Sequence, residues 1–349
     1  LLIFISFILK SEGSNSIEDN QLIDRDKKIF HNQKDVALTS EIIEILSKQH
    51  YVKKPYASIR SKTLNLFIEE LDPAKNIFLE SEVLPFQDDL NVMNNNINSD
   101  LVGIFKLFEI CKNTYLTRHT VQVEFLGQLT GQDLLLNKKI RRDRSEAIRS
   151  NRLDELRTLW KDLIINDVIQ LILSGNTLEE AKEKLSKRLT NQKNFFSQTR
   201  HEHIFNIYAN SLTGSYGPHT NYMSPKTKED FDINMSLSLE GIGALLSSDG
   251  MYTTIASFVA GGPAEKSDSI KPNDRIIGVA QDGDENITDV IGWRIDDVVR
   301  LIRGPKDSKV KLEIIPATSL DDSNTQIIEI KRNVVKLEDK AAKKDIIEI

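Results

Sequence analysis

Two glycines separated by one residue, Gly241 and Gly243, form the part of the sequence best suited to binding a ligand. They lie between an alternating run at 236–240 and a second short strand pattern that begins at Ala244. Glycine adopts positive φ values readily, and successive residues in such a turn can point their N–H groups the same way. A loop of this kind can hold a carboxylate, and the following strand can pair with an extended peptide. A β-turn with no ligand is the alternative for these residues taken alone.

Other reactive side chains lack the spacing that catalysis or metal binding needs. His201 and His203 are two residues apart, whereas a helical zinc site of the metalloprotease type needs two histidines four apart. Ser58, Ser61 and Lys62 have helix spacing, and no glycine-built oxyanion site accompanies them. We interpret all five as surface residues. The sequence therefore predicts no catalytic residue, no metal site and no cofactor.

The composition also excludes some partners. The 349 residues carry a formal net charge of −6, which gives no electrostatic basis for binding nucleic acid. A basic cluster at 138–149 contains no aromatic residue, and Asp143 and Glu146 dilute it, so it predicts a solvated helix face or linker. Cys111 is the only cysteine, which rules out an internal disulfide. Its place on an apolar stripe predicts a core residue and not a nucleophile.

Helical periodicity dominates residues 35–214. We expect the first helix to be capped by Thr39 or Ser40, and a second to end at Asp72 and Pro73. A capping box of Thr177 and Glu180 begins a later helix. Apolar stripes define further helices, including one from about residue 100, one over 153–171 and one that unites 195–212. These are the stripe residues of the helix that begins near residue 100: Leu101, Ile104, Phe105, Phe108 and Cys111. The sequence therefore predicts an all-α domain over residues 35–214.

Near Gly214 the spacing of apolar residues changes from that of a helix to that of a strand. Residues 215–233 form a turn-rich connector, and strand patterns then occur at 252–259, 274–279, 309–315 and 326–331. Two helices are expected, over 264–267 and 294–303. Strands, two helices and a glycine loop indicate a compact α+β module over 234–333.

The order of these pieces resembles a bacterial PDZ domain. The glycine loop at 241–244, Gly262-Pro263-Ala264, the strand at 273–278 and the Ile302–Gly304 turn match that family's pattern in order. The resemblance implies a partly open antiparallel β-barrel with two helices. The expected fold class is therefore multidomain, with an all-α N-terminal domain followed by an α+β PDZ domain.

Flanking motifs narrow the resemblance. The stretches 218–225, 235–244, 290–299 and Leu337–Ala342 are similar to the tail-specific (C-terminal processing) serine proteases of the long periplasmic kind. The similarity covers residues 35–349. Gly217 departs from it, because the family more often has Asp there. In this family a serine activated by a lysine cuts the substrate, in an α/β domain after the PDZ module. We expect residues 334–349 to begin that domain, so no catalytic residue of the family is carried onto this sequence.

The resemblance implies a substrate-recognition role. The chain would bind apolar C-terminal tails of folded or misfolded periplasmic proteins, with an adaptor protein as a possible further partner. In this interpretation residues 244–248 pair with the tail, and Ile295, Val299 and Ile302 belong to the core. The predicted site comprises Gly241, Ile242, Gly243 and Ala244 for the carboxylate, and Leu245, Leu246, Arg294, Val298 and Leu301 for the groove.

Two other functions compete with this one. A PDZ adaptor without a catalytic partner would bind protein C-termini and use the helical domain for docking. A chymotrypsin-like protease with a trailing PDZ domain is disfavoured, because the region before the loop is helical and contains no Gly-x-Ser-Gly nucleophile signal.

The N-terminus bears on localisation. The apolar stretch Leu1–Leu9, followed by the polar residues 10–16, predicts the remnant of a signal peptide over 1–13 and a flexible segment over 14–34. A buried strand or helix turn is the alternative. The stretch is too short to span a bilayer, and no cysteine follows it to carry a lipid. We therefore expect a periplasmic protein, a fragment of a longer reading frame, with no stable membrane span.

Overall fold

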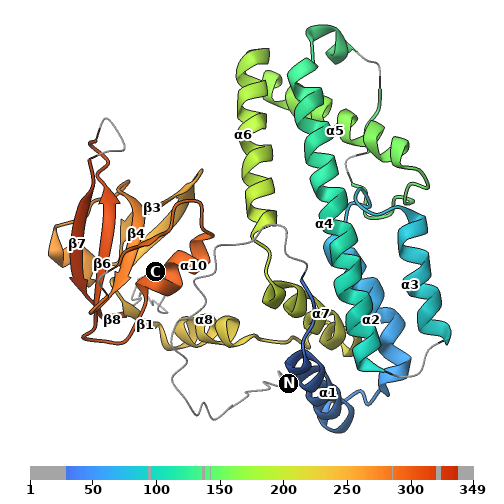
Figure 1. The fold of residues 1–349 in the computed structure, drawn as a ribbon, viewed down its shortest axis with the longest axis horizontal. Coiled ribbons are helices and arrows are strands. Elements are labelled where there is room, and N and C mark those ends of the chain that lie inside the picture. The colour runs from blue at the N-terminus through green and yellow to red at the C-terminus, as the bar shows by residue number, and fades with distance from the viewer. Residues whose placement is uncertain are drawn as a thin grey trace, which may run out of the picture. The chain divides into compact units, whose positions relative to one another are not determined.

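The chain divides into two compact units, a helical unit of residues 1–223 and a β-rich unit of residues 224–349 (Figure 1). The computed structural model describes residues 29–92, 96–135, 138–141, 143–284, 286–319 and 324–336. The predicted signal-peptide remnant at 1–13 and the motif Leu337–Ala342 lie outside these residues, as does most of the segments 14–34 and 334–349. No described helix combines the length and the apolar character that crossing a bilayer requires.

The helical unit is built on two apolar clusters joined by one long helix, α4 (Ile97–Gln128). The first half of α4 packs in the larger cluster, and Leu126 near its end packs in the smaller one. The other elements are α1 (Gln33–Gln49), α2 (Tyr56–Leu71), α3 (Glu80–Val92), the 3-10 helix η1 (Gly131–Leu135), α5 (Leu153–Leu173), α6 (Leu178–Ser197) and α7 (His201–Tyr216).

Several local predictions for this unit are confirmed. All five residues of the stripe predicted near residue 100 are buried in the larger cluster. Helix α2 ends at Leu71, because the Asp72 carboxylate instead accepts the N–H groups of residues 76–78. The capping box of Thr177 and Glu180 begins α6. These features depend on neighbours in sequence, which is why the sequence predicts them.

Two predictions about helix boundaries in this unit are wrong. Helix α1 begins at Gln33, because Asn32 forms a capping box with Asp35, and Thr39 lies buried inside the helix. The helix predicted to unite 195–212 is broken between Ser197 and His201, where Arg200 is extended.

His201 and Arg149, both interpreted from the sequence as solvated, are half-buried and make internal contacts. The His201 Nε2 lies 2.7 Å from the Asp35 Oδ2, and its ring stacks on Phe105 with ring centroids 5.4 Å apart. Arg149, from the basic cluster, forms a buried ion pair with Asp72.

The β-rich unit consists of an antiparallel sheet in the order β2-β3-β4-β6-β7, with β5 paired to β4 and a separate ribbon of β1 and β8. This arrangement after an all-α region confirms the predicted fold class (Figure 1). The strands are β1 (Ser238–Gly241), β2 (Ala244–Asp249), β3 (Tyr252–Phe258), β4 (Arg275–Gln281), β5 (Thr288–Asp289), β6 (Lys309–Ile315), β7 (Gln326–Lys331) and β8 (Asn333–Lys336).

The described residues of this unit also form three helices: α8 (Pro225–Ser236), α9 (Pro263–Ser267) and α10 (Ile295–Ile302). Helix α8 differs from the sequence expectation, which assigned its first residues to a connector. The Ser224 side chain caps it by accepting the Thr227 N–H, and Pro225 suits the first helical position. Its Asp230 pairs with Arg303 at the end of α10, with 2.8 Å between Oδ1 and Nη1. The helix therefore belongs to the β-rich unit.

Candidate peptide-binding site

The glycine loop joins β1 to β2, and the carbonyl groups of Ile242 and Gly243 are bound by the start of α9 and by the turn that precedes it. The Ile242 carbonyl accepts the Ala264 N–H, and the Gly243 carbonyl accepts the Val259 N–H, each at 2.8 Å. Gly243 has φ +73°, a conformation that favours glycine. The Gly-Pro-Ala segment is thus the structural support of the loop, which explains why the two motifs occur together.

The N–H groups of Ile242 and Gly243 have no hydrogen-bond partner within the part of the chain that the structure describes. Both residues are buried, as is Gly241. A buried N–H without a partner is costly, and such groups almost always bind water or a ligand. Two free donors in one short loop can therefore receive a negatively charged group such as a carboxylate.

Strand β2 lies at one edge of the sheet, and no described strand pairs with its outer side. It is the terminal strand of the order β2-β3-β4-β6-β7, and α10 lies along it. Among the predicted pocket residues, Ile242 packs into the core, and Leu246 is half-buried against it. Leu245 is 55% exposed, on the opposite side of the strand. Ala244 is half-buried at the start of β2.

The predicted groove face of α10 does not agree with the burial of its residues. Val298 is fully buried in the core with Ile302, whereas Val299 and Ile295 are half-buried and outside the core cluster. Arg294 lies before the helix, at its N-cap.

Leu301, the third residue of that predicted face, is half-buried against the core. The helix carries two apolar stripes next to each other, so its periodicity alone could not identify the one that faces β4. Ile295 and Val299 are less buried than Val298 and Ile302.

Arg332, for which the sequence predicts no role, lies between β7 and β8 and is 2% exposed. Its guanidinium binds the last carbonyl groups of α10. The Gly304 that follows α10 is the sequence signal for this contact, because a Cβ there would lie 2.9 Å from the Arg332 Cζ.

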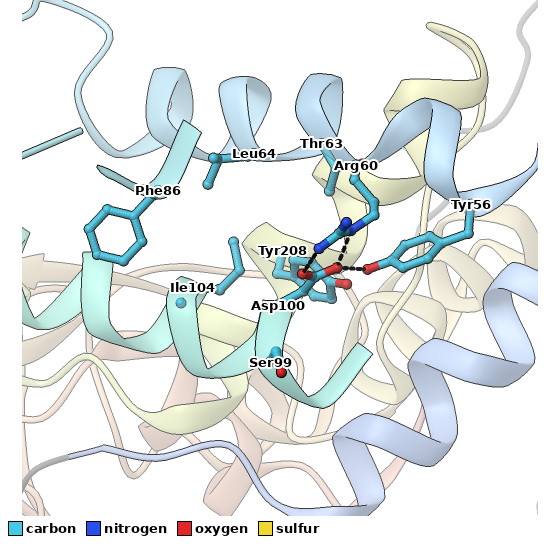
Figure 2. Close-up of a pocket in the computed structure, with 10 residues that line it drawn as sticks. Tyr56, Arg60, Thr63, Leu64, Phe86, Ser99, Asp100, Ile104 and Tyr208 are labelled. Carbon is cyan, nitrogen blue, oxygen red and sulfur yellow. Dashed lines mark hydrogen bonds and ion pairs between the residues drawn. The ribbon is translucent and has the colours of Figure 1, made fainter. Parts of the chain in front are cut away.

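The helical unit contains a separate cavity of about 80 Å³, lined by residues of α2, α3, α4 and α7. Figure 2 shows Asp100 at its polar end, between Arg60 and Tyr56. The Asp100 Oδ2 accepts the Arg60 Nε–H at 2.8 Å and the Tyr56 hydroxyl at 2.5 Å. Burial raises the pKa of Tyr56, which keeps this donor protonated.

The carboxylate in this cavity is thus neutralised by internal partners, an arrangement that joins α2 to α4. Among the described residues no cluster of His, Cys, Asp or Glu could hold a metal ion.

Comparison with known proteins identifies two families along the chain. The tail-specific protease N-terminal domain matches residues 42–226, and the PDZ domain matches residues 230–315.

Similar proteins carry related names. A "Tail-specific protease" of Haemophilus influenzae is 35% identical over 304 residues, which cover 85% of this chain and 42% of that protein. "Carboxy-terminal processing protease CtpA" of Bacillus subtilis is 41% identical over 97 residues, or 28% of this chain and 19% of that protein. The chain thus spans less than half the length of these relatives.

A crystal structure of the PDZ domain of a carboxy-terminal protease from Vibrio cholerae, in complex with peptide, shares 52% sequence identity with this chain. It covers 29% of this chain and 100% of that domain, with a TM-score of 0.28. The family match to residues 42–226 covers more than half of the 349 residues. This chain belongs to the tail-specific protease family.

Proposed function

We propose that this chain selects substrates for a tail-specific protease by binding their apolar C-terminal tails in the PDZ domain. The observation that carries the proposal concerns the N–H groups of Ile242 and Gly243, two buried residues: no described residue accepts from either group, and both carbonyls are engaged. A terminal carboxylate is the part of a polypeptide that such a pair accepts without a cation.

The remainder of the tail fits the neighbouring edge. An extended peptide that places its carboxylate in the loop would run along β2 and add a strand to the sheet. Its last side chain would lie between β2 and α10, against Leu246, Ile295 and Val299. These half-buried apolar side chains can accept an aliphatic or aromatic residue and would disfavour a charged one.

Membership of the family supports the wider role. We infer that the bound tail is presented for cleavage by a serine–lysine pair of the family's α/β domain, acting on periplasmic proteins. An adaptor protein that delivers substrates is compatible with this role. A PDZ adaptor without protease activity is the alternative, and it would bind the same tails.

The test is a titration of the chain with two versions of one peptide that ends in apolar residues. The free-acid peptide is expected to bind with a Kd in the micromolar range, corresponding to about −8 kcal/mol. The C-terminally amidated peptide lacks the carboxylate and should bind at least about tenfold more weakly, a difference of about 1.4 kcal/mol. Equal affinity for the two peptides would contradict the assignment of the loop, and fluorescence anisotropy measures both.

A further inference from the structure

Arg332 makes an unusual set of contacts for a buried arginine. Its three guanidinium nitrogens donate five hydrogen bonds, and all five acceptors are neutral groups. No carboxylate of the described residues forms an ion pair with it. The acceptors are the carbonyls of Leu301 (3.1 Å), Ile302 (2.8 Å) and Lys309 (2.9 Å), the Ser308 hydroxyl (3.0 Å) and the Gln281 side-chain carbonyl (2.6 Å).

These contacts fix the end of α10. The last carbonyls of a helix have no partner within it, and a cation there is favourable. In α10, a helix of 8 residues, Arg332 binds the carbonyls of Leu301 and Ile302. The Gln281 Nε2, from β4, also donates to the Leu301 carbonyl at 2.8 Å. One guanidinium thus joins α10 to β4 and to the start of β6.

The same residue is connected to the carboxylate-binding loop. Strand β8 begins directly after Arg332 and pairs with β1, which leads into the loop. On β8, a methyl group of Val335 lies 3.2 Å from the position that a Cβ on Gly243 would occupy. Arg332 therefore lies where the α10 side and the loop side of the proposed groove meet.

We propose that Arg332 is a positioning residue for tail recognition, which sets the width of the groove between α10 and β2. The proposal rests on the proposed function. Arg332 would not touch the tail, because its side chain is buried at the C-terminal end of α10 and all its N–H groups bind protein acceptors. Without it, α10 loses the guanidinium hydrogen bonds that join its C-terminal end to β4 and β6, and it can move away from β2. The groove would then be wider, so it would hold every tail less tightly, and a large last side chain would lose less affinity than a small one.

Gly304 offers a second way to displace the guanidinium without removing it. A Cβ at Gly304 would lie 2.9 Å from both the Cζ and the Nε of Arg332, which is closer than real contacts allow. Gly304→Ala should therefore shift the guanidinium and reproduce part of the effect of replacing Arg332. Because both substitutions act on one contact, their effects should not add in the double variant.

The experiment measures peptide affinity in the full chain for Arg332→Met, Arg332→Lys, Gly304→Ala and the Arg332→Met/Gly304→Ala double variant. Lys331→Met is the matched control, because Lys331 is adjacent but exposed and forms its ion pair with Asp307 at the surface. Two free-acid peptides are used, one ending in Ala and one ending in Phe. Hydrogen-exchange mass spectrometry of the β-rich unit reports whether each variant is folded.

Arg332→Met is expected to weaken binding about tenfold, and to change the ratio of the Ala and Phe affinities at least about threefold in favour of Phe. Arg332→Lys and Gly304→Ala should show smaller changes in the same direction, and Lys331→Met none. A change of the ratio in folded protein is not expected from a residue that serves stability alone.

Folded variants with wild-type affinity and an unchanged ratio would overturn the proposal, as would an additive double variant. If Arg332→Met does not fold, Arg332→Lys and Gly304→Ala decide the question, and failure of all three to fold would make Arg332 a residue of the fold alone. Absence of tail binding in the wild type would instead contradict the proposed function.

Discussion

A Cβ on Gly243 would lie 3.1 Å from the Cα of Gly262. The two glycines bring the proposed carboxylate-binding loop against the turn before α9, where the Val259 N–H binds the Gly243 carbonyl. A methyl group of Val335 lies on the other side, 3.2 Å from the same position. The loop geometry therefore depends on the absence of a side chain at Gly243, and its positive φ adds a second requirement for glycine.

Gly243→Ala should therefore abolish measurable tail binding. An L-residue in the left-handed region costs about 1–2 kcal/mol, and the added methyl group must also displace Gly262 or Val335. Either displacement moves the N–H groups of the loop away from the carboxylate. Peptide titration by fluorescence anisotropy measures the effect, and the circular dichroism of the helices should not change.

Gly250→Ala is the matched control for this substitution. Gly250 also has a positive φ, +64°, but no atom lies within 4 Å of its Cβ position, at the turn between β2 and β3. The control therefore has the same backbone strain without the crowding. If both variants lost affinity equally, the loss at Gly243 would come from general destabilisation and not from the loop.

The two neighbouring valines of α10 should respond in opposite ways to truncation. Val298→Ala removes methyl groups from a fully buried position and should lower the free energy of unfolding of the β-rich unit by about 2 kcal/mol. Val299→Ala acts at a half-buried position and should reduce tail affinity several-fold with a smaller effect on stability. Hydrogen exchange in the β-rich unit measures the first effect, and peptide titration measures the second. The reverse outcome would restore the groove face that the sequence pattern suggested.

The features that the sequence predicts correctly depend on residues that lie close together in the chain. The stripe from Leu101 to Cys111 and the capping box at Thr177 were predicted because each depends on residues within a few helical turns. The glycine loop was recognised from its position between two strand patterns. These features are properties of one segment, so one segment is enough to predict them.

The parts that were not predicted depend on contacts between distant segments. Arg149 reaches Asp72, 77 residues away, and Arg332 reaches Gln281, 51 residues away. The residues next to a buried arginine in the sequence resemble those next to an exposed one, so the sequence around it does not reveal its burial. The burial of Val298 in place of Val299 is likewise decided by the position of β4, because both stripes of α10 are apolar.

Cys111 should resist alkylation in the folded protein. The thiolate is the reactive form, and burial raises the pKa of the Cys111 thiol to about 12, with smaller contributions from Asp72 and Glu82. The side chain is 1% exposed, so a reagent also has no access to it. Iodoacetamide at pH 8 is expected to leave the native chain unmodified and to modify it fully in denaturant, as mass spectrometry would show. Rapid modification of the native chain would contradict the core assignment.

The raised pKa of the Cys111 thiol makes the stability of the folded chain fall as the pH rises. The folded-state pKa of about 12 lies above the ordinary value of 9.0, so the folded state retains a proton that the unfolded state releases as the pH rises. This contribution to stability is complete below pH 9 and is lost as the pH approaches 12. Between pH 8 and pH 10 the free energy of unfolding should fall by about 1.4 kcal/mol more in wild type than in Cys111→Ala. Tyr115 has a raised pKa as well, so only the difference between the two proteins in urea titrations isolates the thiol. Identical pH dependence in the two proteins would show that the thiol is not shielded from ionisation in the folded state.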